Sequence, residues 1–224
     1  VHAREAVRAD TAWARADLGA LGLGAYVCVV DSGVDLAHPS FRDATGGTRV
    51  AFLLDLEAEP RGVHADLERG GGAVWSAADL DVAMRAGEPI PADTFGHGTA
   101  IASAAAGDDA GLGEPGPGAG AGMAPEARLL VVRALREGAL GFEDADVVRG
   151  VDFCLDASPA PARTVVVLAL GGHDGAHDGT EPLEEALAAH AARGRIVVVA
   201  AGNDGGRALH AAGRAAGASA RLDL

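Results

Sequence analysis

Short apolar runs alternate with amphipathic or alanine-rich stretches along the second half of the chain. The apolar runs have the length of strands, and the stretches between them have helical periodicity. Strands that alternate with helices favour a parallel sheet with right-handed crossover connections. We therefore predict an α/β fold, with a three-layer, mostly parallel twisted sheet that carries helices on both faces. The predicted strands lie at 129–132, 165–170 and 196–201, and the predicted helices lie at 143–155 and 183–193.

The first half of the chain contains the strand that we expect at the centre of the sheet. Residues 26–30 are apolar on both faces, which is typical of a buried parallel strand, and the run ends at Asp31. A short helix is predicted over 10–18, with Asp10 or Thr11 as its cap. Further along we expect a strand at 50–54, a helix or strand at 77–84, a helix at 99–106 and a Gly- and Pro-rich loop at 107–122.

Composition and charge exclude two classes of protein. The chain has 18 basic residues against 32 acidic ones, which gives a net charge of −14. Because nucleic-acid binding needs a cationic face, we expect no nucleic-acid partner. No apolar run approaches the roughly 20 residues of a membrane-spanning helix, so we expect no membrane partner either.

The two cysteines, Cys28 and Cys154, both lie in apolar segments. We expect them to be buried free thiols, and a disulfide between them is the alternative. Two cysteines do not make a disulfide scaffold, and they do not fix the compartment of the protein.

A parallel α/β sheet gathers its functional groups at the C-terminal ends of its strands, and two of three notable polar residues lie at such ends. Asp31 ends the first apolar run, His97 stands between two glycines just before a helix, and Asn203 follows the last apolar run. Taken singly, each has a structural interpretation, as a cap, a core histidine or a turn residue. Their order and spacing together point to a shared site.

These blocks resemble those of the subtilisin-like serine peptidases, the subtilase family. The resemblance covers roughly two-thirds of the chain. The family implies an aspartate block first, then a histidine block, a strand, a substrate-cleft strand and an oxyanion block. The matching segments are, in that order, Ala25–Asp35 with His38-Pro39, Gly96–Gly107, Gly122–Ala127 with Leu129–Leu135, Leu168–Gly172 and Ile196–Gly205.

The resemblance implies a role for each polar residue. Asp31 would orient and stabilise the imidazole of His97, and His97 would act as general base towards a serine. Asn203 would donate a hydrogen bond to the developing oxyanion. An extended peptide or protein substrate would lie between two cleft segments. The residues that the resemblance assigns to substrate binding are Gly138, Leu140, Leu170, Gly171 and Gly172.

The sequence also departs from the family pattern. None of its six serines stands in the Gly-Thr-Ser context of the family's nucleophile. The chain looks cut at both ends, so we expect the serine beyond Leu224, on a C-terminal continuation or a second chain, and we expect the fragment alone to be inactive. Ser40 and Ala169 replace family residues, the former at a calcium-binding position. We assign no metal and no cofactor.

The sequence also suggests how the chain is divided into domains. Residues 1–217 would form the N-terminal part of a peptidase domain, with 42–92 as an insertion that either faces the substrate or forms a surface flap. Residues 218–224 alternate polar and apolar positions and would begin a further β segment or an inserted subdomain. The family resemblance alone favours an extracellular or cell-envelope location.

Two other functions remain open. The chain could be a non-catalytic relative that keeps the peptidase fold for binding or scaffolding. It could also be another doubly wound hydrolase, because the segment from Asp31 to Asp35 resembles the paired aspartates of the aspartyl phosphatases. The spacing of four residues in this chain differs from the two that the phosphatase pattern requires.

Overall fold

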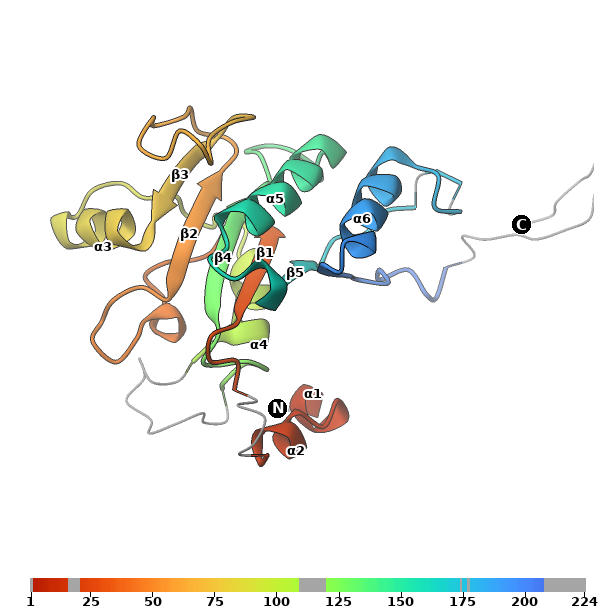
Figure 1. Ribbon diagram of the computed structural model, residues 1–224, viewed down its shortest axis with the longest axis horizontal. Coiled ribbons are helices and arrows are strands. Elements are labelled where there is room, and N and C mark those ends of the chain that lie inside the picture. Colours follow the sequence, from red (N-terminus) through yellow and green to blue (C-terminus); the bar gives the residue numbers. More distant parts are fainter. Residues whose placement is uncertain (1, 16–20, 109–119, 174, 177, 208–224) are drawn as a thin grey trace, which may run out of the picture.

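A six-stranded sheet forms the centre of the computed structural model, in the order β3-β2-β4-β1-β5-β6 (Figure 1). The structure describes residues 2–15, 21–108, 120–173, 175–176 and 178–207. All neighbouring strands are parallel except β2 and β3, which confirms the predicted fold class. The strands are β1 (Tyr26–Asp31), β2 (Val50–Asp55), β3 (Ala73–Ser76), β4 (Arg128–Arg133), β5 (Thr164–Leu168) and β6 (Ile196–Val199).

Helices cover both faces of the sheet and give two separate apolar cores. On one face, α3 (Ala77–Ala86) and α4 (His97–Ala106) pack against the sheet. On the other face lie α5 (Asp144–Ala157) and α6 (Pro182–Ala192). Two short helices, α1 (His2–Ala6) and α2 (Ala9–Trp13), lie near the N-terminus, away from the sheet (Figure 1).

Strand β1 occupies the centre of the sheet because its side chains are apolar on both faces. Val27 and Val29 belong to the core on the α4 side, whereas Cys28 and Val30 belong to the core on the α5 side. Successive side chains of a strand point to opposite faces. Asp31, two residues after Val29, therefore faces the side of the sheet that carries α4.

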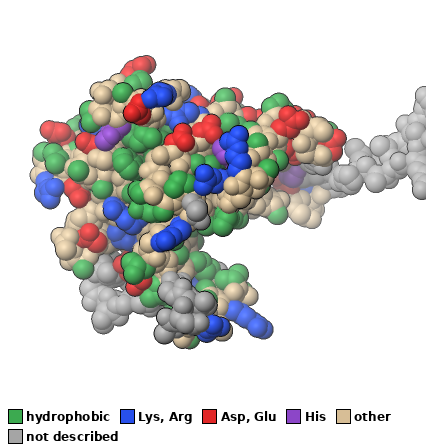
Figure 2. All heavy atoms as spheres, in the orientation of Figure 1, with side chains coloured by type: hydrophobic (Ala, Val, Ile, Leu, Met, Phe, Trp, Pro, Cys, Tyr) green, Lys and Arg blue, Asp and Glu red, His purple; other side chains and the backbone are tan. Residues whose placement is uncertain are grey.

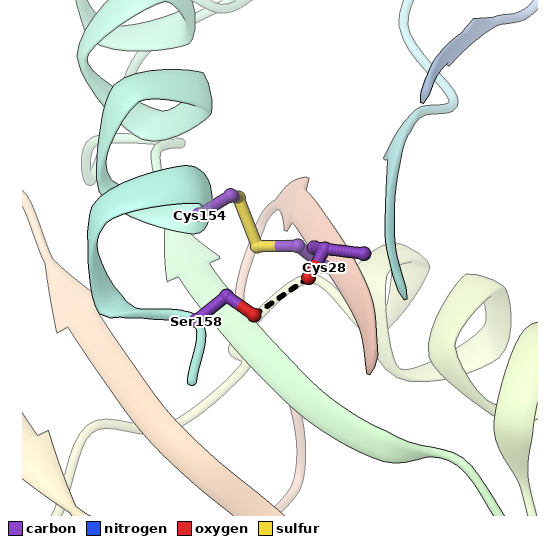
Figure 3. Close-up of a disulfide and its surroundings, with 4 residues drawn as sticks. Cys28, Cys154 and Ser158 are labelled. Carbon is purple, nitrogen blue, oxygen red and sulfur yellow. Dashed lines mark hydrogen bonds between the residues drawn. A yellow bond between two sulfur atoms is a disulfide. The ribbon is translucent and has the colours of Figure 1, made fainter. Parts of the chain in front are cut away.

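A disulfide joins Cys28 of β1 to Cys154 of α5, so the expectation of two free thiols is wrong (Figure 3). Both cysteines are completely buried. The sequence could not decide between the two states because pairing depends on how a helix crosses a strand 126 residues away. A hydrogen bond of 2.6 Å between the hydroxyl groups of Ser158 and Thr164 lies just beyond the end of α5.

Several predicted elements differ in extent from those observed. Helix α2 begins at Ala9 and has no side-chain cap, so neither Asp10 nor Thr11 has the predicted role. The ambiguous stretch at 77–84 is the helix α3, and β3 was not predicted. The strands expected at 165–170 and 196–201 end earlier, at Leu168 and Val199. The tail at 218–224 and most of the loop at 107–122 lie outside the described residues.

The stretch 42–92 adds β2 and β3 to the same sheet and places α3 against one of its faces. Among the described residues, no helix is both long and apolar enough to span a membrane. On the face shown in Figure 2, acidic and basic side chains are interspersed, and no large basic patch is visible there.

Candidate active site

The parallel strands bring their C-terminal ends to one edge of the sheet, and Asp31 lies at that edge. Asp31 is the last residue of the central strand β1 and is completely buried. Its carbonyl oxygen accepts hydrogen bonds from the backbone N–H groups of Ala134 and Leu135. A buried carboxylate needs hydrogen-bond donors, and the next elements supply them.

His97 meets Asp31 across 66 residues of sequence, as expected. The Nδ1 atom of His97 lies 2.9 Å from each carboxylate oxygen of Asp31. An ionised carboxylate only accepts hydrogen bonds, so Nδ1 carries the proton in this contact. The imidazole is 41% exposed and the aspartate side chain is 1% exposed. The pair therefore joins a buried acid to a histidine ring that solvent can reach.

Two glycines around His97 make this contact possible for different reasons. A Cβ atom on Gly98 would lie 2.1 Å from the carbonyl oxygen of Gly33, so only glycine lets α4 approach β1 this closely. Gly96 has open space around it but a φ of 87°, which glycine adopts at little cost.

Asp93 is a site residue that the sequence analysis missed. Its carboxylate accepts hydrogen bonds from the hydroxyl groups of Ser32 and Thr99 and from three backbone N–H groups of the 95–99 segment. Burial opposes ionisation of Asp93, but the hydrogen bonds from Thr99, Gly96 and Ser32 outweigh it and hold the pKa of Asp93 below its usual range. The only sequence signal was an aspartate four residues before His97.

Asn203 lies at the same edge of the sheet, two strands away from Asp31. It follows β6, which pairs with β5, and β5 pairs with β1. Its side chain is exposed. A Cβ atom on Gly171 would lie 3.4 Å from the Cα atom of Gly202, so the end of the β5 segment passes close to the Asn203 turn. His173 Nε2 also lies 2.9 Å from Asp204 Oδ2, which joins the same two segments.

The two predicted cleft segments follow β4 and β5. Gly138 and Leu140 are exposed in the loop after β4, and Leu140 is fully open to solvent. An ion pair attaches this loop to α5. The Nε and Nη2 groups of Arg136 donate to the two carboxylate oxygens of Asp146, at 2.7 and 2.8 Å. After β5, Leu170 packs at the margin of the α5 core, and Gly171 and Gly172 continue from it.

The stretch 42–92 also reaches this edge of the sheet. A cavity of about 480 Å³ opens there, and Asp55 and Arg133, the last residues of β2 and β4, are among its lining residues. Trp75, Ile90 and Thr94 form other parts of the wall. The part of the chain that the structure describes holds no group of three His, Cys, Asp or Glu side chains placed for a metal ion.

Comparison with known proteins gives a consistent result. A sequence profile described as the Subtilase family matches residues 22–221. The serine protease AprX of Bacillus subtilis (strain 168) is 34% identical over 186 residues, which are 79% of this chain and 39% of that protein. Thermitase of Thermoactinomyces vulgaris is 28% identical over 205 residues, or 90% of this chain and 54% of thermitase. The chain thus spans about half or less of the length of these relatives.

A solved structure shares the fold. The CspB protease of Clostridium perfringens superposes with a TM-score of 0.64 at 26% sequence identity. The superposition covers 80% of this chain and 36% of the CspB chain.

Proposed function

The chain belongs to the subtilase family, and we propose that it carries the aspartate, the histidine and the oxyanion-binding asparagine of a serine endopeptidase. The observation that supports this most directly is the contact between His97 Nδ1 and both oxygens of the Asp31 carboxylate, at 2.9 Å. The relatives named above are serine proteases, which agrees with the same chemistry.

In this proposal Asp31 and His97 act as a unit. By accepting the Nδ1–H of His97, Asp31 fixes the tautomer in which Nε2 is free to take a proton. His97 removes the proton of the attacking serine hydroxyl and returns it to the leaving amine. Asp31 then stabilises the imidazolium that forms between the two steps.

Asn203 and the two cleft segments serve the substrate. The side-chain N–H of Asn203 donates to the oxyanion that develops on the scissile carbonyl oxygen. The peptide lies extended between the segment with Gly138 and Leu140 and the segment with Leu170, Gly171 and Gly172. Backbone hydrogen bonds dominate such strand addition, so tolerance of many peptide sequences is expected.

The nucleophile is proposed to be a serine outside these 224 residues. Ser32 is adjacent to Asp31, but its hydroxyl group already donates to Asp93 and accepts from the N–H of Gly98, and the residue is 3% exposed. A buried hydroxyl with both functions occupied is a poor candidate to attack a peptide.

The test uses the complete protein with a peptide substrate and a serine-directed covalent inhibitor. Asp31→Asn is expected to lower kcat by about 10⁴, because the asparagine favours the wrong tautomer. Asn203→Ala is expected to cost about 10²–10³ in kcat, a range borrowed from a subtilisin. His97→Ala should abolish inhibitor labelling and turnover together.

A matched control comes from a second histidine–aspartate pair in the same chain. His64 Nε2 lies 2.7 Å from Asp79 Oδ2, outside the proposed site. His64→Ala should therefore leave kcat within about twofold, since it touches no group of the proposed site. Peptide hydrolysis that survives His97→Ala, or a complete protein that neither cleaves peptides nor reacts with the inhibitor, would contradict the proposal.

A further inference from the structure

We propose that Asp93 is a positioning residue, which joins the strand that ends in Asp31 to the helix that begins at His97 and thereby fixes the imidazole against the carboxylate. The consequence for catalysis rests on the function proposed above. The structural claim can be tested without any catalysis.

The first observation concerns the start of α4. The first N–H groups of a helix have no partners within the helix, and they are usually capped by a nearby side chain. The N-cap of α4 is Gly96, which has no side chain. Its place is taken by Asp93, three residues before Gly96, and by Ser32, 66 residues before Gly98. Ser32 Oγ accepts from the N–H of Gly98 at 2.9 Å, and Asp93 Oδ2 accepts from the N–H of Thr99 at 2.9 Å.

The second observation is that the same two residues bond to each other and that one of them, Ser32, also bonds to Asp31. Ser32 Oγ donates to Asp93 Oδ1 at 2.9 Å, and the backbone N–H of Ser32 donates to Asp31 Oδ1 at 2.7 Å. The hydrogen bonds therefore form a closed ring, from Asp31 through Ser32 and Asp93 to the first turn of α4 and back through His97 to Asp31.

The third observation is that only a carboxylate can hold all of these donors. Asp93 Oδ1 accepts from Ser32 Oγ and from the N–H groups of Phe95 and Gly96, at 2.9, 3.1 and 2.8 Å. Asp93 Oδ2 accepts from both the N–H and the hydroxyl of Thr99, at 2.9 and 2.5 Å. An asparagine would present an NH₂ group to one of these two sets of donors, so it cannot replace the aspartate.

Thr99 extends the ring to the loop that follows β1. Its O–H group donates to Asp93, and its hydroxyl oxygen accepts from the backbone N–H of Asp35 at 2.9 Å. The start of α4 is thus attached to the chain on both sides of Gly33, the residue whose carbonyl oxygen leaves no room for a side chain on Gly98. Removal of the Asp93 carboxylate should let the first turn of α4 and His97 move.

The primary experiment follows the His97 imidazole by NMR in the present chain. The histidines are labelled with ¹⁵N, the buffer is mildly alkaline, and the His97 signals are assigned by their loss in His97→Gln. The ¹⁵N chemical shifts of the His97 ring should then report the Nδ1–H tautomer. In Asp93→Asn we expect the Nδ1–H signal to be lost, or its exchange with water to be about tenfold faster. Asp43→Asn is the matched control. Asp43 also accepts from a threonine hydroxyl and two backbone N–H groups, in a loop outside the site.

Two outcomes would overturn the proposal. One is an unchanged Nδ1–H signal in folded Asp93→Asn, which would make Asp93 a helix cap and nothing more. The other is an equal loss in Asp43→Asn, which would assign the effect to general destabilisation. If Asp93→Asn does not fold, Thr99→Val makes the same comparison by removing one bond to Oδ2, with Thr99→Ser expected to restore the signal.

A second experiment concerns the complete protein. Asp93→Asn should lower kcat at least tenfold and change KM by less than about twofold, because a misplaced general base affects the chemical step and not substrate binding. Asp43→Asn should change neither. If the unmutated protein cleaves no peptide, the proposed function fails, whereas the NMR result still decides the role of Asp93.

Discussion

At Gly98 the first turn of α4 and the end of β1 come closer than a Cβ atom permits. Any larger residue would meet the carbonyl oxygen of Gly33 and the Cβ atom of Asp31, at 2.1 and 3.1 Å. Both are fixed by the central strand, so the helix would have to move. Even an alanine at position 98 should therefore disturb both the Asp31–His97 contact and the packing of α4.

We predict that Gly98→Ala lowers the free energy of unfolding by about 3 kcal/mol, the upper end of the usual cost of overpacking. The measurement is a denaturant titration of the purified chain. Gly141→Ala is the control, because Gly141 has open space around it and should change stability by less than about 0.5 kcal/mol. Equal stabilities of the two variants would show that α4 adjusts without cost.

Arg49 is a buried cation whose side-chain hydrogen bonds go to backbone carbonyl groups. It is 7% exposed, and it donates to the carbonyl oxygens of Ser40, Ala106, Pro125 and Ala127. Removal from water lowers its pKa from the ordinary value. The guanidinium thereby joins the segment before β2, the end of α4 and the start of β4.

We predict that Arg49→Met destabilises the chain by about 3 kcal/mol or more, because buried carbonyl groups lose their donors. Arg49→Lys should also destabilise, since an ammonium group cannot reproduce the planar fork of donors. Thermal unfolding of both variants tests this. Arg69→Met removes an exposed arginine that pairs with Asp66 in its own loop, and it should be nearly neutral. A neutral Arg49→Met would contradict the prediction.

Some residues of the candidate site could be recognised from the sequence alone, and others could not. Asp31, His97 and Asn203 could be proposed from the sequence because each stands at the end of an apolar run or between glycines. Asp93 and Ser32 were missed, since their importance lies in hydrogen bonds between loops that only the folded chain brings together. The state of Cys28 was misjudged because its partner Cys154 lies on a helix that only the folded chain places against β1.

Helix α3 begins with a capping box that a histidine from the preceding loop reinforces. Ser76 and Asp79 exchange hydrogen bonds between side chain and backbone, and His64 contacts the Asp79 carboxylate. Burial works to raise the pKa of Asp79, but the bonds from His64 and Ser76 outweigh it and lower that pKa from 3.8 to about 2. Asp79 therefore stabilises the fold above its ordinary pKa, and this contribution disappears as the pH falls towards 2.

We predict that Asp79→Ala costs about 1–2 kcal/mol near pH 7, allowing for the partial exposure of the pair. The difference from the unmutated chain should shrink as the pH is lowered from about 4 to 2, because protonated Asp79 loses its role. Urea unfolding at several pH values measures this. Asp66→Ala, at an exposed position, should show no comparable difference at any pH. A constant difference for Asp79→Ala across this range would refute the assignment.

At the level of elements, periodicity predicted the type of most strands and helices but not their ends. Strand β3 was missed because Ala73–Ser76 is short, follows three glycines and pairs only with β2. Its existence depends on the neighbouring strand and not on its own sequence. The alternation of strands and helices after residue 128 was sufficient to predict the sheet, because that pattern has few packed solutions.

The disulfide acts on the molecule as a whole, since it closes a loop between residues 126 positions apart. A crosslink of this span restricts the unfolded chain strongly, by about 4–5 kcal/mol in the chain-entropy model. Because Cys28 and Cys154 are both 0% exposed, a reductant cannot reach the bond in the folded state.

We predict that the double variant Cys28→Ala, Cys154→Ala unfolds at a much lower denaturant concentration than the oxidised chain. Thiol titration should find no reactive thiol after treatment with reductant in native buffer and two after treatment in denaturant. The reduced and refolded chain is the control, because it lacks the crosslink but keeps both cysteine side chains, whereas the alanine variant also loses their volume. If oxidised and reduced chains unfold at the same midpoint, the bond contributes no stability.

The strand order has a consequence for how the protein is made. Of the six described strands β1 leaves the ribosome first, yet its two neighbours are β4 and β5, and β5 ends about 140 residues after β1 begins. At the usual pace of translation, roughly 5–20 residues per second, β1 waits about 7–30 seconds for its second neighbour. During that interval one or both edges of β1 have no neighbouring strand to pair with. A strand that stays unpaired for this long is exposed to aggregation until its neighbours arrive. Asp31 gains its contacts with His97 and Ala134 only after those later segments have been made.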